Sequence, residues 1–487
     1  MPEESIKKKS VRGTVWSFID NFSTMFLSFI IGIVLARLLS PADYGTVGVL
    51  SIFLALANTF VDCGFGNAII RKKGYTQEDT STAFFFNAGV GVLVYLVLFL
   101  ISPLVTDFFK MPILKILLRV LGLVVFFNGL SIVQTAQFTA QLKIKTLMYV
   151  NVGTQIPMGL IGIYFAYQGY GVWTLVIQQV GSSVLKTILL WYLSKWRPSL
   201  TFKKESFHYL FNFGWKLLGA NLMGTFFNEI YGFVIGRMMG ASDLGLYSKA
   251  KQLANTPMTI LNNVINRVVL PILVQTQGDK SQVRNVYSKL IQLVSFFVAP
   301  AYFLLVVIAR PLINIIWTTK WSGTIVLFQI FCVGMIFGPI SQLNFSLLQL
   351  LNRTDLTLKL EFIKKPVLLI ILLVSISFGV KGVVIGASVY NIYGSLVNMS
   401  PTRKLLDYSY KNQLIDILKY VGIAIVTCCL ACLASWSIEN DFLSLVVGLV
   451  SYNLIYLIIS IVFRLPAYNT ALGLLPEKVR KYVPGQK

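Results

Sequence analysis

The stretch ARLLSPADYG at residues 36–45 recurs as GRMMGASDLG at residues 236–245. Each copy ends an apolar run of helical length with Arg and two bulky apolar residues. Each then passes through a short turn to Asp-x-Gly and a second apolar run. Upstream, Trp16 and Trp215 open the two first runs at matching places. The repeat predicts a duplicated half-molecule, an architecture typical of membrane carriers that enclose a substrate between two halves.

The composition predicts a membrane protein. Hydrophobic residues make up 56% of the 487 residues, charged residues 13%, and the mean hydropathy is +0.73. These values exclude a soluble domain of this size. Apolar blocks of about 20 residues are long enough to cross a bilayer of about 30 Å. We therefore expect an all-α polytopic membrane protein with about fourteen transmembrane helices. Their predicted positions are residues 13–36, 43–68, 82–103, 116–138, 148–167, 171–194, 208–236, 243–274, 290–308, 322–350, 360–379, 382–401, 416–436 and 442–463.

The charges of the predicted loops are strongly asymmetric. Most Lys and Arg residues fall at the N-terminus, in every second loop and in the C-terminal tail. The opposite side carries seven: Arg37, Lys110, Lys115, Arg237, Arg310, Lys320 and Lys381. The bias predicts that both termini are cytoplasmic. It also accounts for much of the net charge of +23, so no nucleic-acid partner is expected.

The echoes between the halves predict a six-plus-six-plus-two layout. Gly171-Val172 and Gly382-Val383, for example, open matching blocks after short turns. We expect two parallel six-helix lobes at residues 1–205 and 206–402. Two additional helices and a cytoplasmic tail follow at residues 403–487.

Catalytic chemistry has little support in the sequence. The five cysteines lie inside apolar blocks without metal-ligand partners, and His208 is the only histidine, so no histidine pair exists. The chain has no phosphate-binding loop motif. We predict no catalytic residue, no metal and no cofactor, and we expect that the protein is not an enzyme. His208, at a helix entrance, is interpreted as an ordinary interfacial residue.

Cations inside apolar blocks point to a polar interior. Nine lie within or at the margins of the blocks: Arg119, Lys186, Lys216, Lys249, Lys251, Arg267, Lys364, Lys365 and Lys419. Charges at bilayer depth are costly unless they snorkel, pair or face water. Snorkelling is expected for Arg119 and Lys419 at block ends, and for at least one of Lys364 and Lys365. The eighth block instead presents Lys251, Asn255 and Asn262 on one helical side, which cannot face lipid.

The first two spans of each half concentrate the polar membrane positions, so we expect a cationic cavity between the halves. Lys and Arg there would hold an anion such as a phosphate through charge-assisted hydrogen bonds. The predicted substrate-binding residues are Lys216, Lys249, Lys251, Arg267, Asn255 and Asn262. Asp20, Asp62 and Glu229 are predicted either to couple transport to a proton or cation, or to neutralise nearby cations.

The repeated turn itself is interpreted as structural. Each Arg can offset carbonyls at a helix end, each Asp can cap the next helix, and each Gly permits close helix packing. The predicted structural-turn residues are Arg37, Asp43, Gly45, Arg237, Asp243 and Gly245. We prefer a rigid hinge at this turn to a substrate contact.

Together, the R-L-L-x-P-x-D-Y-G turn, the charged N-terminus, the span layout and the basic interior resemble the lipopolysaccharide or O-antigen flippases. These form the polysaccharide transporter branch of the multidrug/oligosaccharidyl-lipid/polysaccharide exporter superfamily. The resemblance covers essentially the whole chain. It implies transport of an undecaprenyl-pyrophosphate-linked oligosaccharide from the cytoplasmic to the periplasmic leaflet of the bacterial inner membrane. Membrane lipids and other polysaccharide assembly proteins are the implied partners.

Two other functions are considered. A drug or cation antiporter of the same superfamily would share the fold, but it would favour acidic and aromatic residues over the lysines found here. A membrane polymerase or ligase of lipid-linked sugars would need catalytic groups at the outer face. The longest outer connections, near residues 104–115 and 309–321, contain only Asp107 as an acid.

Overall fold

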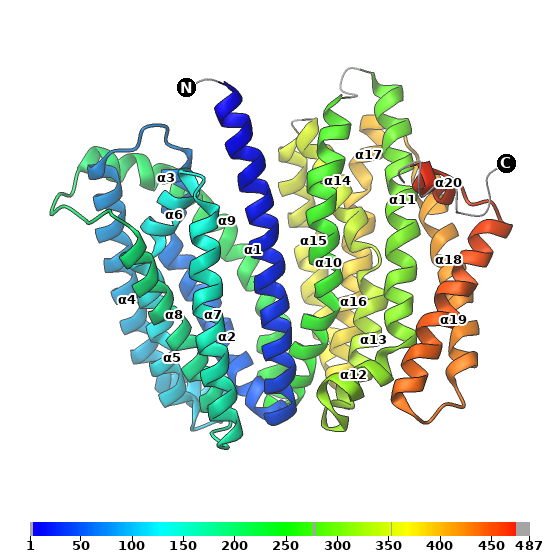
Figure 1. Ribbon diagram of the computed structural model, residues 1–487, viewed down its shortest axis with the longest axis horizontal. Coiled ribbons are helices and arrows are strands. Elements are labelled where there is room, and N and C mark those ends of the chain that lie inside the picture. The colour runs from blue at the N-terminus through cyan, green and yellow to red at the C-terminus, as the bar shows by residue number, and fades with distance from the viewer. Residues whose placement is uncertain (1–2, 276–278, 352, 474–487) are drawn as a thin grey trace. The chain divides into compact units, whose positions relative to one another are not determined.

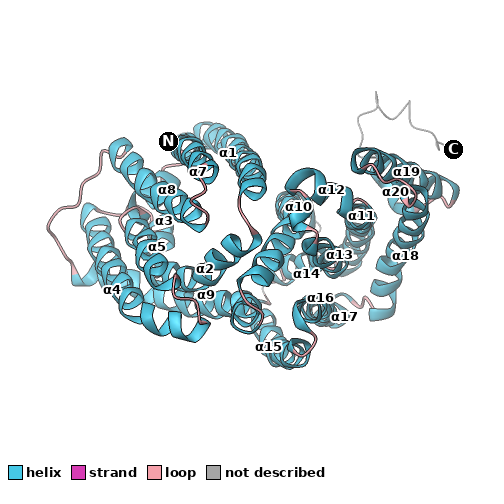
Figure 2. Ribbon diagram, turned by 90° about the horizontal axis from the view of Figure 1, so that it is seen from below, coloured by secondary structure: helices cyan, strands magenta, loops and turns pink. Residues whose placement is uncertain are grey.

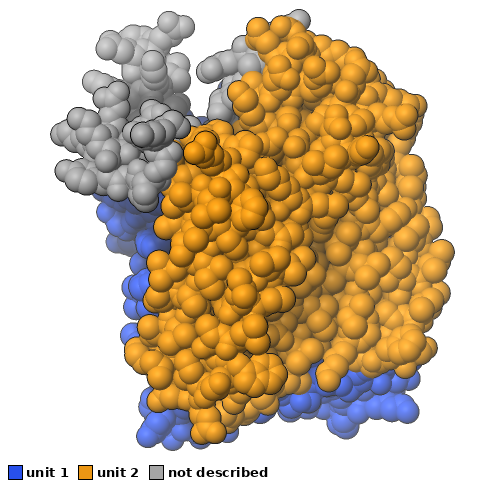
Figure 3. Space-filling view, turned by 90° about the vertical axis from the view of Figure 1, so that its right-hand side faces the viewer, with its two compact units in different colours: residues 1–245 blue, residues 246–487 orange. Residues whose placement is uncertain are grey.

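The computed structural model describes residues 3–275, 279–351 and 353–473. Within these ranges the chain forms helices joined by short loops, with no strand (Figure 2). It divides into two compact units, Met1–Gly245 and Leu246–Lys487, coloured separately in Figure 3. Within each unit the helices run side by side and are seen end-on in Figure 2.

The helices of the first unit, and the helix that leads into the second, have the following bounds (Figure 1): α1 Glu3–Leu38, α2 Pro41–Asp62, α3 Phe65–Arg71, α4 Gln77–Phe109, α5 Leu114–Gly129, α6 Ile132–Ala140, α7 Ile144–Tyr167, α8 Val172–Leu193, α9 Lys204–Met238 and α10 Ala241–Gln275. The second unit continues with α11 Lys280–Val307, α12 Ala309–Trp317, a 3-10 turn Thr319–Trp321, α13 Gly323–Met335, α14 Gly338–Leu350, α15 Thr354–Ile376, α16 Gly379–Asn398, α17 Ser400–Leu406, α18 Tyr410–Ser435, α19 Asp441–Val462 and α20 Pro466–Gly473.

The prediction of an all-α polytopic membrane protein is confirmed. In the described part of the chain, 10 helical segments are long and apolar enough to cross a membrane. Four of them join two consecutive helices, as α2 and α3 do in Pro41–Arg71. The other four predicted spans coincide with α7, α9, α10 and α15. Both α10 and α15 interrupt their apolar sequence with charged residues, consistent with the polar interior expected of a carrier.

The division into units differs from the predicted lobe boundary at residue 205. Helix α9 opens the second predicted repeat, yet it packs against α2, α3 and α4 of the first. The first compact unit therefore runs to Gly245. The repeat boundaries at 205 and 402 remain predictions from sequence similarity between the halves.

Local capping explains where two of the helices begin. At α2, the Ser40 hydroxyl accepts a hydrogen bond from the Asp43 amide, and the Asp43 carboxylate accepts one from the Ser40 amide. Thr76 and Asp79 form the same reciprocal box at the start of α4. These contacts satisfy amides that the first helical turn leaves without an intrahelical partner.

The two additional helices belong to the second unit, where α18 packs on α11 and α19 on α12. Asp416 of α18 accepts hydrogen bonds from Ser288 (2.8 Å) and Gln292 (2.9 Å) of α11, and a further one from Tyr408. A carboxylate with three neutral donors therefore connects α18 to the preceding helices.

Candidate functional site

The second membrane span is broken beside α9. Helix α2 ends at Asp62, and Cys63 (φ 41°) and Gly64 (φ 70°) are both left-handed before α3 begins. Glycine tolerates this conformation without steric cost. A Cβ on Gly214 of α9 would lie 2.3 Å from the Cys63 carbonyl oxygen, so the break packs directly on the α9 backbone. Discontinuous helices are where membrane carriers commonly place binding groups.

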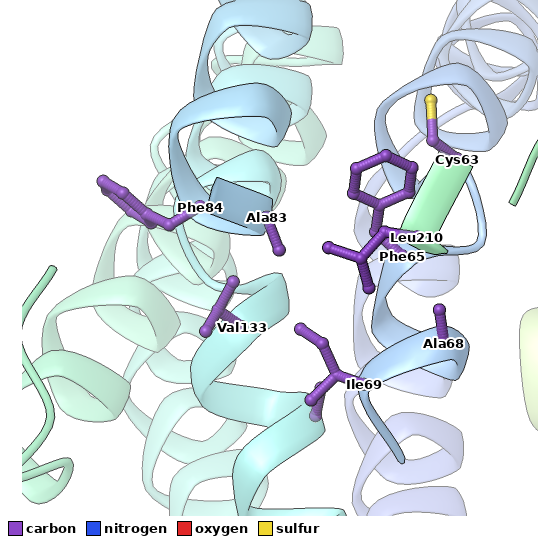
Figure 4. Packing of buried hydrophobic residues seen from close by; sticks show 9 residues of the cluster. Cys63, Phe65, Ala68, Ile69, Ala83, Phe84, Val133 and Leu210 are labelled. Carbon is purple, nitrogen blue, oxygen red and sulfur yellow. The ribbon is translucent and has the colours of Figure 1, made fainter. Parts of the chain in front are cut away.

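A buried apolar cluster fixes α3 against the start of α9 (Figure 4). Phe65 and Ile69 of α3 and Leu210 of α9 are fully buried and pack with residues of α4 and α6. The Phe65 ring stacks on Phe86 at a centroid separation of 4.6 Å. Because all these side chains interlock, α3 and the first turns of α9 form one rigid support.

A concave polar surface lies on this support. Its cavity volume is about 860 Å³. Its lining side chains are mostly exposed to solvent, with Phe213 half-buried. The lining comprises Arg71 of α3 together with Lys204, Glu205, His208, Tyr209, Asn212, Phe213 and Lys216 of α9. We call this the α3–α9 pocket. Helix α3 lies at the end of the first unit where α1 begins (Figure 1).

Two cations that flank the pocket are neutralised by carboxylates. Lys72 donates to Asp79 at 2.8 Å, and the Asp79 side chain is 1% exposed. Lys203 donates to Glu78 at 2.9 Å, and this hydrogen bond raises the pKa of the Lys203 ammonium. The first contact joins the loop before α4 to the first turn of α4. The second joins the linker before α9 to the same turn.

The cations that line the pocket are not paired with carboxylates, unlike the neighbouring Lys72 and Lys203, in the described structure. Among the described residues, Arg71, Lys204 and Lys216 form no ion pair. The Arg71 guanidinium lies over the Phe213 ring, 5.3 Å from its centroid. Glu205 is the sole carboxylate of the lining. The pocket is therefore cationic and suited to an anion with more than one negative charge.

The predicted substrate-binding residues fall in both units. Lys216 lines the pocket of the first unit. In the second unit, Lys249 is 6% exposed, with its ammonium 5.5 Å from the centroid of the Trp317 ring of α12. Lys251 and Asn255 lie on α10, and the Lys251 ammonium lies over the Tyr247 ring. The side chains of Asn262 and Arg267 lie outside the described part of α10. A shared cavity for all these residues stays a prediction.

The three predicted coupling carboxylates have different surroundings. Asp20 of α1 accepts hydrogen bonds from Asn151 of α7 at 3.3 Å and from Thr24 at 3.3 Å. No ion pair of Asp20 occurs among the described residues. Asp62 is half-buried at the α2–α3 break, and Glu229 is half-buried on α9.

The repeated turns lie against each other inside the first unit. A Cβ on Gly45 would lie 1.6 Å from the Ala241 carbonyl oxygen, and one on Gly245 would lie 1.9 Å from that of Pro41. Asp43 belongs to the capping box of α2, and Asp243 lies in the first turn of α10. Arg237 packs over the Phe108 ring at 5.0 Å, whereas Arg37 is an exposed residue in the last turn of α1.

The two lysines for which snorkelling was considered share a carboxylate. Lys364 and Lys365 both pair with Glu361, one turn earlier on α15, and snorkelling of either stays a prediction. The Lys364 side chain is buried, and its Cδ approaches Gly394 of α16. Pairing with a carboxylate lowers the cost of placing these charges within a membrane span.

Sequence reasoning missed three pocket residues. Arg71 and Lys204 fall among the loop cations of the predicted charge bias, and His208 was interpreted as an ordinary interfacial residue. In the sequence, all three lie near the ends of apolar blocks, on the same predicted side of the membrane. This position does not show which loops contact each other in the fold. Only the packing of α3 on α9 brings Arg71 close to His208 and Lys204.

Comparison with known proteins places the chain in a family. Residues 34–326 match the family described as "Polysaccharide biosynthesis protein". The chain belongs to this family. Among curated relatives, it is 26% identical to "Lipopolysaccharide biosynthesis protein WzxC" of Escherichia coli, over 85% of each chain. It is also 26% identical to "Teichuronic acid biosynthesis protein TuaB" of Bacillus subtilis, over 72% of this chain and 73% of the relative.

Solved structures share the fold of this family member. The structure of "Lipid II flippase MurJ, inward closed conformation" matches 92% of this chain and 99% of its own, with a TM-score of 0.72 and 14% identity. An inward-facing multidrug resistance MATE family transporter matches 79% of this chain and 94% of its own, with a TM-score of 0.62 and 13% identity. At these identities the likeness concerns the fold.

Proposed function

We propose that this protein is a flippase. It moves a polyprenyl-diphosphate-linked oligosaccharide from the cytoplasmic to the periplasmic leaflet by alternating access, during assembly of a surface polysaccharide. Family membership, the names of the relatives and the MurJ-like fold support this proposal. The observation that carries it is the α3–α9 pocket, whose cations have no carboxylate partner among the described residues and so suit a phosphorylated headgroup.

In this mechanism the headgroup leaves water while the polyprenyl tail remains in lipid. With both termini cytoplasmic, the pocket opens at the cytoplasmic face and takes up the phosphates first. Lys216, and the lysines of α10, then hold the charge while the two lobes rock and reopen the cavity outward. Asn255 and its neighbours on α10 meet sugar hydroxyls. The close contact of Gly45 with Gly245 holds the two turns together, which suits them to act as the hinge about which the lobes move.

Transport in one direction requires an energy source, and Asp20 is the strongest coupling candidate of the three predicted carboxylates. Its described hydrogen-bond partners, Asn151 and Thr24, are neutral. Lys186 interacts with Asp20 electrostatically but forms no ion pair with it in the described structure, so a proton or monovalent cation could exchange there without breaking one. Asp62 and Glu229 would adjust the charge balance near the headgroup.

The alternative functions fit the site less well. A carrier of cationic drugs would need excess negative charge, whereas the pocket is lined by three cations and one carboxylate. A polymerase or ligase would need reacting groups, and the pocket residues are suited to binding and charge neutralisation.

The proposal is tested by reconstitution. The purified protein is placed in proteoliposomes that carry a fluorescent polyprenyl-diphosphate disaccharide, and a membrane-impermeant quencher reports which leaflet the sugar occupies. We expect exchange between leaflets well above that of protein-free liposomes, with the glycan unchanged by mass spectrometry. Exchange equal to protein-free liposomes at verified protein content would reject a flippase. Extension or transfer of the glycan would instead indicate an enzyme.

A further inference from the structure

We infer that the α3–α9 pocket is the first docking site for the diphosphate of a lipid-linked headgroup, with Arg71, Lys204 and Lys216 as its anion-binding residues. The lipid-linked character of the ligand rests on the proposed flippase function. The diphosphate chemistry rests on the pocket itself. None of these residues except Lys216 was expected to bind substrate from the sequence.

Two adjacent pairs of residues show how the charge of this surface is divided. Lys203 is paired with Glu78, while Lys204, the next residue, lines the pocket without an ion pair in the described structure. Lys72 is paired with Asp79, while Arg71, the preceding residue, lines the pocket with its guanidinium on Phe213. The carboxylates of this surface thus neutralise the flanking cations and leave those of the pocket available.

The pocket is also held ready for a ligand. Phe213 restricts the Arg71 side chain by a cation–π contact. The Lys72 ammonium lies 4.9 Å from the Tyr209 ring centroid and is itself anchored by Asp79. Leu210, on the same turn of α9, belongs to the buried cluster that joins α9 to α3. The Arg71 guanidinium therefore loses little conformational entropy when an anion binds, which favours affinity.

Charge and size together indicate a diphosphate that bears a sugar. Arg71, Lys204 and Lys216 against Glu205 leave an excess of positive charge, which matches a diphosphate better than a single carboxylate. A guanidinium binds phosphate oxygens through two parallel hydrogen bonds. The volume of about 860 Å³ exceeds the need of two phosphates and leaves room for a sugar beside Tyr209 and Asn212. His208 supplies a further hydrogen-bond donor.

The test measures binding to the full-length protein in phosphatidylcholine nanodiscs, which carry no net lipid charge. The probes are farnesyl diphosphate, inorganic pyrophosphate and farnesol. We expect farnesyl diphosphate to bind more tightly than pyrophosphate, and farnesol to bind weakly. Arg71→Ala, Lys204→Ala and Lys216→Ala should each weaken farnesyl diphosphate binding about tenfold, the loss of one charge-assisted hydrogen bond. Lys204→Arg should retain most of the affinity.

Lys203→Ala is the matched control. It removes the same charge one residue away in the chain, at a position that is paired with Glu78. It should change the affinity by less than about twofold, since exposed pairs contribute little. Equal weakening by Lys203→Ala and Lys204→Ala would overturn the pocket in favour of general surface charge. Unchanged binding by all three pocket variants, at wild-type thermal stability, would also overturn it. Pyrophosphate binding as tight as that of farnesyl diphosphate would overturn the lipid-linked ligand.

The leaflet-exchange assay separates this inference from the proposed function. If the wild-type protein exchanges the lipid between leaflets and the pocket variants bind farnesyl diphosphate normally, the protein is a flippase without this docking site. If the pocket variants lose binding but the wild-type protein does not exchange the lipid, the protein is a diphosphate receptor and not a flippase.

Discussion

Gly45 and Gly245, equivalent residues of the duplicated turn, pack backbone against backbone. A Cβ on Gly45 would lie 2.9 Å from the Gly245 amide nitrogen, and one on Gly245 would lie 3.1 Å from that of Gly45. The first turns of α2 and α10 therefore cross through reciprocal contacts. A duplication can generate this contact because each copy supplies the same small residue to it.

We predict that Gly45→Ala or Gly245→Ala destabilises the protein strongly. The added methyl group would lie 1.6 or 1.9 Å from a carbonyl oxygen, so the helices must separate. The expected cost is on the order of 3 kcal/mol or more. Thermal unfolding in detergent measures it. Gly32→Ala on α1 is the control, because no atom lies within 4 Å of where its methyl group would be, and it should unfold like the wild type. Equal stability of Gly45→Ala and Gly32→Ala would contradict the close crossing.

Asp79→Asn should destabilise the loop between α3 and α4. The buried carboxylate accepts hydrogen bonds from Lys72 and from the Thr76 amide. Hydrogen bonds to a charged group contribute about 1.5–3 kcal/mol each, so we expect a loss on the order of 2 kcal/mol. The midpoint of thermal unfolding reports the change. Glu78→Gln, next to it and exposed, removes a surface pair and should have almost no effect. A larger effect of Glu78→Gln would refute this assignment.

Glu361→Gln should leave a lysine pair inside the membrane region without its carboxylate. Lys364 is buried but the Glu361 side chain is 38% exposed, so the cost should be below the roughly 3–5 kcal/mol typical of a fully buried pair. We expect poor expression and a lower unfolding temperature. Combining Glu361→Gln with Lys364→Met should recover most of the loss, since the buried charge is then also removed. No recovery in the double variant would mean that Glu361 acts through another contact.

Asp416→Asn should loosen α18 from α11. The carboxylate accepts hydrogen bonds from Ser288, Gln292 and Tyr408, and an amide nitrogen cannot accept them. Amide hydrogen exchange is expected to accelerate near the start of α18, with the first unit unchanged. The control is Asp407→Asn, which removes an exposed pair with Lys280. Faster exchange in the first unit would show a global rather than a local role.

Sequence reasoning reached the helical class, the span positions and the family resemblance because these depend on local composition. A bilayer requires apolar segments of sufficient length, and such segments are visible along the chain. It did not find the break at Cys63 and Gly64, since this lies inside a continuous apolar block. It also did not pair Lys364 with Glu361, although their i, i+3 spacing places them on one face of a helix.

The α3–α9 pocket shows why the candidate site was predicted only in part. Lys216 stood out as a cation within an apolar block, whereas Arg71 and Lys204 looked like the many other loop cations. What distinguishes them is that they line one pocket with Lys216 and form no ion pair in the described structure. Pairing depends on contacts between residues far apart in the chain, as between Lys203 and Glu78.

The sequence by itself determined that this protein crosses the membrane many times, and it predicts two related halves and an excess of positive charge on one side. These properties follow from hydrophobic block length, self-similarity and loop composition, which need no knowledge of contacts. The tertiary structure decided which cations are neutralised, where α2 breaks and which side chains share the pocket. Those outcomes depend on how α3 and α4 pack against α9, because electrostatic pairing and close glycine contacts act over a few ångströms in space, independent of distance along the chain.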